Sequence, residues 1–182
     1  MESIPTLTTP RLILRPFTIE DAPAVERLAG AREVADTTLS IPHPYPEGGG
    51  AAWIETHATT WQSGNGLHLA IALRETPNAL IGAIGLSIDR DHSRGELGYW
   101  INVADWGRGY ATESSRAIMS FGFGELGLHR IQARHFTRNP SSGRVMEKLG
   151  MRFEGINRDT YFRWGRFEDA AVYGILASEW NG

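Results

Sequence analysis

The sequence contains no cysteine, so disulfide bonds, a thiolate nucleophile and cysteine-ligated zinc are all excluded. It also has no apolar run approaching the roughly 20 residues that a helix needs to cross a bilayer. An acid and two prolines interrupt the first 10 residues, unlike the apolar core of a signal peptide. We therefore expect a cytoplasmic protein that does not act at a membrane.

The chain also has no large excess of charge of one sign. It contains 18 basic and 21 acidic residues, which gives a formal net charge of −3. No basic field would draw this chain to nucleic acid, so we expect no such partner. The 6 histidines are scattered without the spacing of metal ligands, and we expect no bound metal. Most of the following aromatic residues are expected to form core or cleft wall: Tyr45, Trp53, Trp61, Tyr161, Phe162 and Trp164.

A chain of 182 residues, 41% of them hydrophobic, is long enough to bury a sizeable core, and we expect a single domain over residues 1–182. Three prolines in residues 41–46 argue against regular structure there. Elsewhere the apolar spacing predicts both helices and strands. We expect strands at residues 11–16, 67–89 (a hairpin), 96–103, 128–138, 152–164 and 169–180, and helices at residues 18–29, 47–62, 110–126 and 140–149.

This order of elements predicts a mixed α/β sheet with helices on its faces. Strands 96–103 and 128–138 are joined by a helix, so we expect them to lie side by side and parallel, through a right-handed crossover. A ligand is expected outside the carboxyl end of the first of these strands.

The connection that follows residues 96–103 has the features of an anion site. Gly107 and Gly109 allow the backbone to approach a phosphate with no Cβ in between, and Arg108 adds a charge suited to phosphate oxygens. The first amides of the next helix lack intrahelical partners, and the helix dipole is positive there. Neither the P-loop nor the dinucleotide-binding glycine pattern is present, so a phosphate site and a plain tight connection both remain open from these residues alone.

Six motifs extend this reading to nearly the whole chain: residues 9–16 (TPRLILRP), 98–101 (GYWI), 106–113 (WGRGYATE), 128–131 (LHRI), 139–142 (NPSS) and 145–151 (VMEKLGM). Together they resemble the GNAT superfamily of acyl-coenzyme A N-acyltransferases, and within it the ribosomal-protein alanine N-acetyltransferase (Rim-type) branch. The resemblance implies a GNAT-like α/β fold: a central, mostly antiparallel seven-stranded sheet with one splayed parallel strand pair, and helices on both faces.

The resemblance also implies acetyl-CoA as co-substrate. Trp106 stands where the family has glutamine or arginine at the start of its pyrophosphate loop, and the backbone contacts depend on the glycines that follow. The pantetheine arm would pair with the backbone of Ile101, Asn102 and Val103 much as an added strand would, and Asn139 would hold its end. The loop implied for the diphosphate comprises Trp106, Gly107, Arg108, Gly109, Tyr110, Ala111 and Thr112.

The implied reaction is attack of a neutral amine on the thioester carbonyl, which requires a base because amines are mostly protonated at neutral pH. We expect Glu96 to be that base, acting through water, with His68 as its rival. A freed strand amide near Ile101 could stabilise the negative oxygen. Ser142, in the first turn of a helix and near the sulfur, is expected to be the general acid. His43 in the proline-rich loop and His57 in the second helix could form part of a substrate rim, and we assign a catalytic role to neither.

The acceptor stays open at this stage. The resemblance favours a protein N-terminal amine, but a small amine such as a polyamine, amino acid or aminoglycoside is an alternative within the same reaction. A module that binds acyl-CoA without turnover is an alternative of another class. We expect a monomer or a homodimer.

Overall fold

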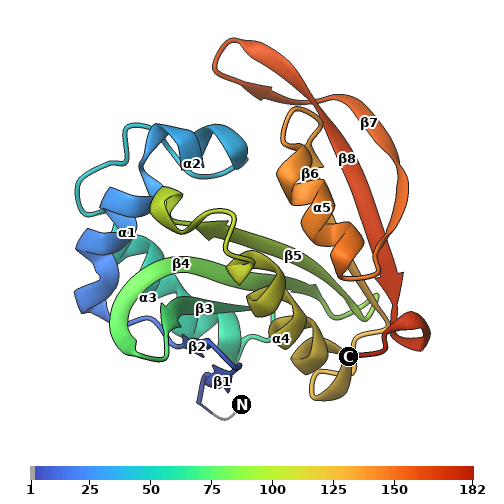
Figure 1. The fold of residues 1–182 in the computed structure, drawn as a ribbon, viewed down its shortest axis with the longest axis horizontal. Coiled ribbons are helices and arrows are strands. Elements are labelled where there is room, and N and C mark those ends of the chain that lie inside the picture. The colour runs from blue at the N-terminus through green and yellow to red at the C-terminus, as the bar shows by residue number, and fades with distance from the viewer. Residues whose placement is uncertain (1–2) are drawn as a thin grey trace.

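The computed structural model describes residues 3–182 and contains one twisted sheet, whose strands lie in the order β1-β2-β3-β4-β5-β6-β8-β7 (Figure 1). Neighbouring strands are antiparallel except for β5 and β6, which are parallel. The strands are β1 (Leu7–Thr8), β2 (Leu12–Arg15), β3 (Gly66–Leu73), β4 (Thr76–Asp89), β5 (Arg94–Ile101), β6 (Arg130–Phe136), β7 (Arg152–Arg163) and β8 (Arg166–Leu176).

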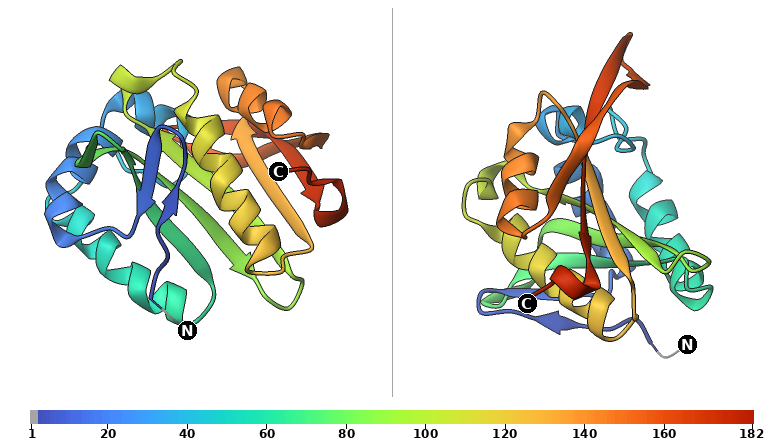
Figure 2. Two further views of the ribbon diagram at one scale, coloured as in Figure 1. Left: turned by 60° about the horizontal axis from the view of Figure 1, so that its bottom comes forward. Right: turned by 90° about the vertical axis from the view of Figure 1, so that its right-hand side faces the viewer.

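Helices cover both faces of this sheet (Figure 2). The α-helices are α1 (Ala22–Ala29), α2 (Arg32–Thr37), α3 (Gly49–Gln62), α4 (Tyr110–Gly124) and α5 (Pro140–Lys148), and 3-10 turns occupy Ile19–Asp21, Val103–Asp105 and Ala177–Glu179. The fold class is the one expected, but the sheet has 8 strands rather than seven. The two-residue β1 and the six-residue α2 were not expected from the sequence, because elements this short carry too little apolar periodicity.

Alternating side chains build a separate core on each face of the sheet. Large aliphatic residues such as Leu69 and Leu86 pack with Ile118 and Met119 of α4 on one face. Small residues and Trp100 pack on the other face against α1 and α3. The alternation is what period-two spacing demands of a strand covered on both sides.

The parallel pair separates part-way along its length. Strands β5 and β6 are paired over four positions only, from Arg94 opposite Arg130 to Leu97 opposite Ala133. Beyond them β5 continues beside β4 up to Ile101, while β6 continues beside β8 up to Phe136. The expected splayed parallel pair is therefore confirmed, and beyond Leu97 one edge of β5 has no strand partner in the described part of the chain.

Strand β5 ends at Ile101 rather than at residue 103. The Asn102 amide donates to the Ile81 carbonyl of β4 (2.8 Å), and the Asn102 side-chain amide donates to Asp105 Oδ2 (2.9 Å). Val103–Asp105 then forms a 3-10 turn. A local side-chain bond of this kind competes with strand pairing, which explains the earlier end.

The β7–β8 hairpin extends beyond the rest of the molecule (Figure 1). Its end exposes aromatic side chains, because Phe162 is 66% and Trp164 41% accessible. These two residues are exceptions to the expectation of core or cleft wall, although the Arg32 guanidinium lies 5.1 Å from the centre of the Trp164 ring. No helix in the described part of the chain is long and apolar enough to span a bilayer.

Candidate active site

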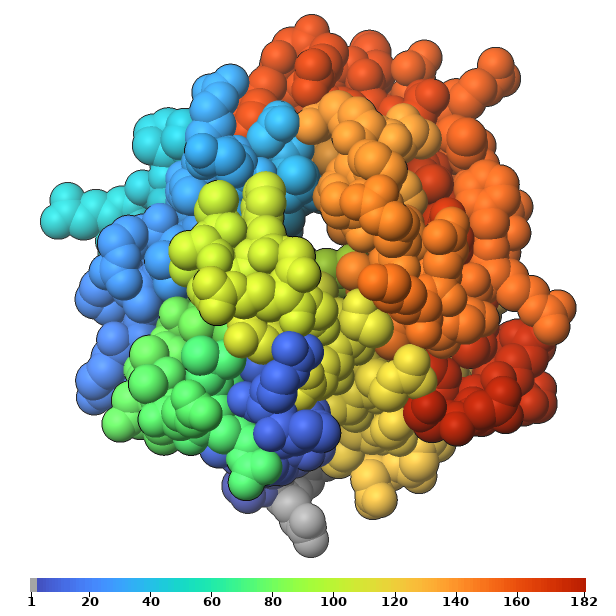
Figure 3. Space-filling model, viewed as in Figure 1, coloured from blue at the N-terminus to red at the C-terminus, as the bar shows by residue number. Residues whose placement is uncertain are grey.

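A cavity of about 500 Å³ lies where β5 and β6 separate. Its wall comes from both faces of the sheet, from α1, α3 and α5, and from the segment after α2. In the space-filling view an opening is visible between the segment that precedes α4 and helix α5 (Figure 3). A volume of this size is typical of small-molecule sites.

The connection between β5 and α4 presents a run of free amides beside this opening. Gly107 (φ +75°) and Gly109 (φ +81°) adopt the left-handed backbone that the turn requires. The first bond of α4 runs from the Glu113 amide to the Gly109 carbonyl (3.0 Å), and the amides of residues 107–112 donate to no acceptor within residues 3–182. Consecutive unsatisfied amides at a helix start favour a bound anion.

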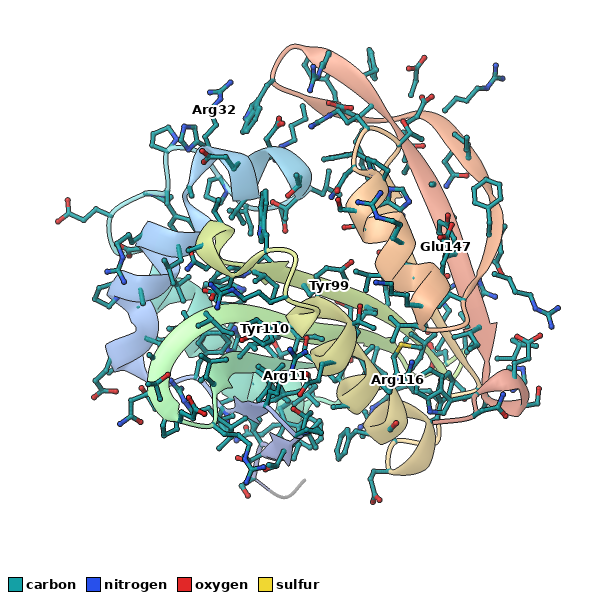
Figure 4. All side chains as sticks on the ribbon, viewed as in Figure 1. Arg11, Arg32, Tyr99, Tyr110, Arg116 and Glu147 are labelled. Atoms are coloured by element: carbon teal, nitrogen blue, oxygen red, sulfur yellow. The ribbon has the colours of Figure 1, made fainter. Side chains whose placement is uncertain are left out.

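Side chains from elsewhere fix the shape of this connection. Trp106 donates from its indole nitrogen to the Ile101 carbonyl (2.7 Å), so the turn is tied to the end of β5. Arg11 donates to the Arg108 carbonyl (3.0 Å) and to Glu113 Oε2 (2.6 Å). Its guanidinium also lies 4.8 Å from the centre of the Tyr110 ring, and the two side chains can be found side by side in Figure 4.

Helix α5 brings the Ser142 hydroxyl to the cavity, and β5 brings the Tyr99 hydroxyl next to it. Asn139 donates from Nδ2 to Ser142 Oγ (3.1 Å), which orients the serine in the first turn of the helix. The Tyr99 hydroxyl is buried next to Ser142, and burial raises the pKa of Tyr99 to about 12. Figure 4 places Tyr99 between α4 and α5. Tyr99 therefore keeps its proton at neutral pH.

Glu96 lies at the cavity in an ion pair. Its Oε2 accepts hydrogen bonds from Arg134 Nη2 and from Gln132 Nε2 (2.9 Å). Arg134 in turn donates from Nη1 to the Tyr161 hydroxyl (2.7 Å). These bonds use one carboxylate oxygen and hold the side chain in place, and Oε1 has no protein partner in the part of the chain described here.

His68 lines the same cavity from β3 and stacks on His57 of α3, with ring centres 4.8 Å apart. Trp53 meets the His57 ring edge-on at 4.4 Å. Burial and the neighbouring His68 lower the pKa of His57 to about 4, and burial lowers the pKa of His68. Both rings are therefore neutral at pH 7, and neither His57 nitrogen has a hydrogen-bond partner among residues 3–182. His57 is only 4% exposed, so it does not form part of a substrate rim.

The structure brings Glu96, His68 and Ser142 to one cavity, with Asn139 bound to Ser142. The residues of the amide-rich connection lie beside its opening. Sequence reasoning missed three partners of these groups, namely Tyr99, Gln132 and Arg134, because their spacing carries no local pattern. Tyr161 lines the cavity as expected, but its bond to Arg134 was not foreseen. Across the described chain, no group of three or more histidine or acidic side chains could hold a metal ion.

Comparison with known proteins gives a consistent result. The family model described as the acetyltransferase (GNAT) domain matches residues 11–152. An uncharacterized N-acetyltransferase of Bacillus subtilis, YoaA, is 35% identical over 94% of this chain and 97% of its own length. The B. subtilis protein YdaF, provisionally designated a ribosomal N-acetyltransferase, is 33% identical over 57% of each chain.

The fold comparison points the same way. The crystal structure of a GNAT-family acetyltransferase from Bacillus anthracis superposes with a TM-score of 0.84 and is 27% identical. The match covers 96% of this chain and 100% of that one.

Proposed function

Because the chain belongs to the GNAT family of acetyl-CoA-dependent N-acetyltransferases, we propose that it acetylates the amino terminus of a protein or peptide. The observation that carries the proposal is the cavity at the split between β5 and β6, which joins an amide-rich helix start to a pocket with a single, already paired carboxylate.

The residues present fit acetyl-CoA. Six consecutive free amides at residues 107–112 suit its diphosphate, and the unpaired edge of β5 suits the amides of its pantetheine arm. Acetyl-CoA would supply the acetyl group as an activated thioester. Asn139, bound to Ser142, would lie at the end of the arm.

Two side chains would move the protons. Glu96 would accept the proton of the acceptor amine through a water on its free Oε1, while Arg134 and Gln132 hold Oε2. Ser142 would donate a proton from Oγ to the departing sulfur, in the first turn of α5, where the helix dipole favours an anion. His68, neutral at pH 7 and on the same cavity, is the rival base.

The charges in the cavity favour an acceptor with one amine. Glu96 carries the only carboxylate among the described lining residues, and Arg134 already pairs with it. A polyamine or an aminoglycoside would bring several ammonium groups into a pocket with no further acid to receive them, which is costly. A peptide amino terminus brings a single charge. The provisional designation of YdaF as a ribosomal N-acetyltransferase agrees with such an acceptor.

Thiol release from acetyl-CoA, measured over a panel of acceptors, tests the proposal. The panel contains peptides with different first residues, the same peptides with blocked amino termini, spermidine, free amino acids and an aminoglycoside. We expect turnover with free amino termini only. Turnover that is faster with spermidine or the aminoglycoside would contradict the peptide acceptor, and CoA binding without turnover on any amine would contradict a catalytic role.

Variants at the two rival bases complete the test. Glu96→Gln keeps the shape of the side chain and an oxygen that can accept a hydrogen bond from Gln132 or Arg134. The amide cannot take up a proton, so we expect kcat to fall by about 10². His68→Gln is the matched variant, and we expect a smaller effect. A larger loss for His68→Gln would assign the base to the histidine.

A further inference from the structure

Gly98 occupies an unusual place in the sheet. It lies on the central strand β5, yet it is exposed, and a Cβ added to it would meet no atom within 4 Å. Its φ is not in the left-handed region, and the register between β4 and β5 runs from Gly82 to Asp89 without a bulge. The usual structural reasons for a glycine inside a strand are therefore missing, which leaves the approach of a ligand.

The position of Gly98 relative to the split is equally specific. Leu97 is the last β5 residue paired with β6, so Gly98 is the first one at which the two strands have separated. The thioester proposed above would cross the sheet through this gap. A group that reaches the thioester from the face of α1 and α3 must pass over Gly98.

The same face carries the groups proposed to handle the acceptor. Gly98 lies opposite Gly85, which lies opposite His68, so the three form one row across the sheet and share a face. Glu96 is two residues before Gly98 and points to the same side. A Cβ on Gly85 would lie 2.7 Å from His68 Nδ1, so the His68 ring already covers that glycine. Of the two glycines in this row, only Gly98 therefore has open space at its Cβ position, two strands from His68 and two residues from Glu96.

We infer that the amine-bearing carbon of the acceptor and the substituent on that carbon lie against Gly98. The absence of a side chain at Gly98 sets the size of acceptor that the enzyme accepts. This inference rests on the proposed transfer to an amine. It makes Gly98 a specificity-determining position, because an added Cβ would occupy the substituent's space and has no protein atom within 4 Å.

Gly98→Ala and Gly98→Val test this with peptides of one sequence whose first residue is Gly, Ala, Ser, Val or Leu. We expect kcat/KM to fall progressively with the size of the first residue, by about tenfold or more for leucine relative to glycine in Gly98→Val. The affinity for CoA should stay within about twofold, because its proposed contacts are with backbone atoms of residues 101–103 and 107–112, which the substitution leaves in place. Gly124→Val is the matched control, since Gly124 also has open space around its Cβ position. An equal loss for all peptides, or no loss, would overturn the inference.

The absence of cysteine allows a second test that needs no turnover. Gly98→Cys introduces the only thiol in the chain, and Gly124→Cys serves as the exposed reference. We expect methyl, propyl and benzyl methanethiosulfonates to label the Gly98 variant readily, and acceptor peptide to slow the labelling. If the wild type acetylates no amine, the proposed function fails while this test still applies. Slow labelling that no peptide alters would show that the space over residue 98 is inaccessible, and this would overturn the inference.

Discussion

At the scale of single residues, Ser142 depends on neighbours that the sequence does not reveal. The spacing of Asn139 and Ser142 within a known motif was enough to single them out, and the bond between them was found in the structure. Tyr99, which adds a second protonated hydroxyl next to Ser142, lies on a different element and is brought there by the sheet. A residue of this kind cannot be found from local spacing.

Ser142→Ala tests the role of the serine as general acid. We expect kcat to fall by about 10² with little change in CoA affinity, because a proton donor is lost and no backbone contact changes. Stopped-flow or steady-state thiol release measures the effect. Ser141→Ala is the matched control, since Ser141 is an exposed neighbour that only accepts a bond from Arg144. An unchanged kcat would remove Ser142 from the mechanism and direct attention to Tyr99.

The lowered pKa of His57 predicts how the free energy of unfolding depends on pH. The pKa of His57 is lowered from 6.5 to about 4 in the folded chain. Between about pH 6.5 and pH 4, His57 is therefore protonated in the unfolded chain but neutral in the folded chain. The free energy of unfolding consequently falls over this range, by up to about 3 kcal/mol. His57→Phe keeps an aromatic ring and removes this proton, so its free energy of unfolding should fall less over that range. Urea denaturation at pH 7 and pH 4.5 measures the difference, and equal decreases for wild type and variant would contradict the assignment.

At the scale of elements, the central unit is the strand, turn and helix formed by β5, the two glycines and α4. Glycine spacing, the strand pattern and the helix pattern each pointed to this unit from the sequence, because all three signals are local. The end of β5 was placed two residues too far along, because a side-chain bond from Asn102 to Asp105 decides it. The separation of β5 from β6 came only through resemblance to a family, since no local pattern encodes how far two strands stay paired.

Gly109→Glu tests the turn. The left-handed φ of +81° at this position strains any other residue, and the new carboxylate would lie where the diphosphate is proposed to bind. We expect the affinity for CoA, measured by isothermal titration calorimetry, to fall by about 100-fold or more. Gly127→Glu is the matched control, because Gly127 has a φ of +64° and open surroundings beyond the other end of α4. Retained affinity in Gly109→Glu would mean that the diphosphate binds elsewhere.

At the scale of the whole molecule, the cavity is closed by contacts between distant parts of the chain. Arg163, at the end of β7, donates from Nη2 to the carbonyls of Ile41 (2.6 Å) and Ala35 (2.8 Å). Arg138 bridges Asp36 of α2 (2.8 Å) and Glu168 of β8 (2.9 Å). The hairpin therefore holds α2 and the segment after it against the acceptor side of the cavity. Except for the pair of Arg138 and Glu168, which are 30 positions apart, these contacts join residues more than 100 positions apart. They could not be predicted from the sequence.

Arg163→Ala should loosen this closure. Hydrogen bonds from a charged group contribute about 1.5–3 kcal/mol, so we expect KM for the acceptor to rise by about tenfold or more, with CoA affinity unchanged. Amide hydrogen exchange in residues 35–42 should become faster. Arg152→Ala is the matched control, because Arg152 lies on the same strand but pairs with Glu179 at the other end. Unchanged exchange and KM would show that the hairpin does not hold this segment.

A crystal structure with acetyl-CoA bound tests the central claim most directly. The account predicts diphosphate oxygens about 3 Å from several amides of residues 107–112. It also predicts that the thioester lies in the gap between β5 and β6, with its sulfur next to Ser142. A diphosphate bound away from these amides, or a thioester that does not enter the gap, would contradict the account.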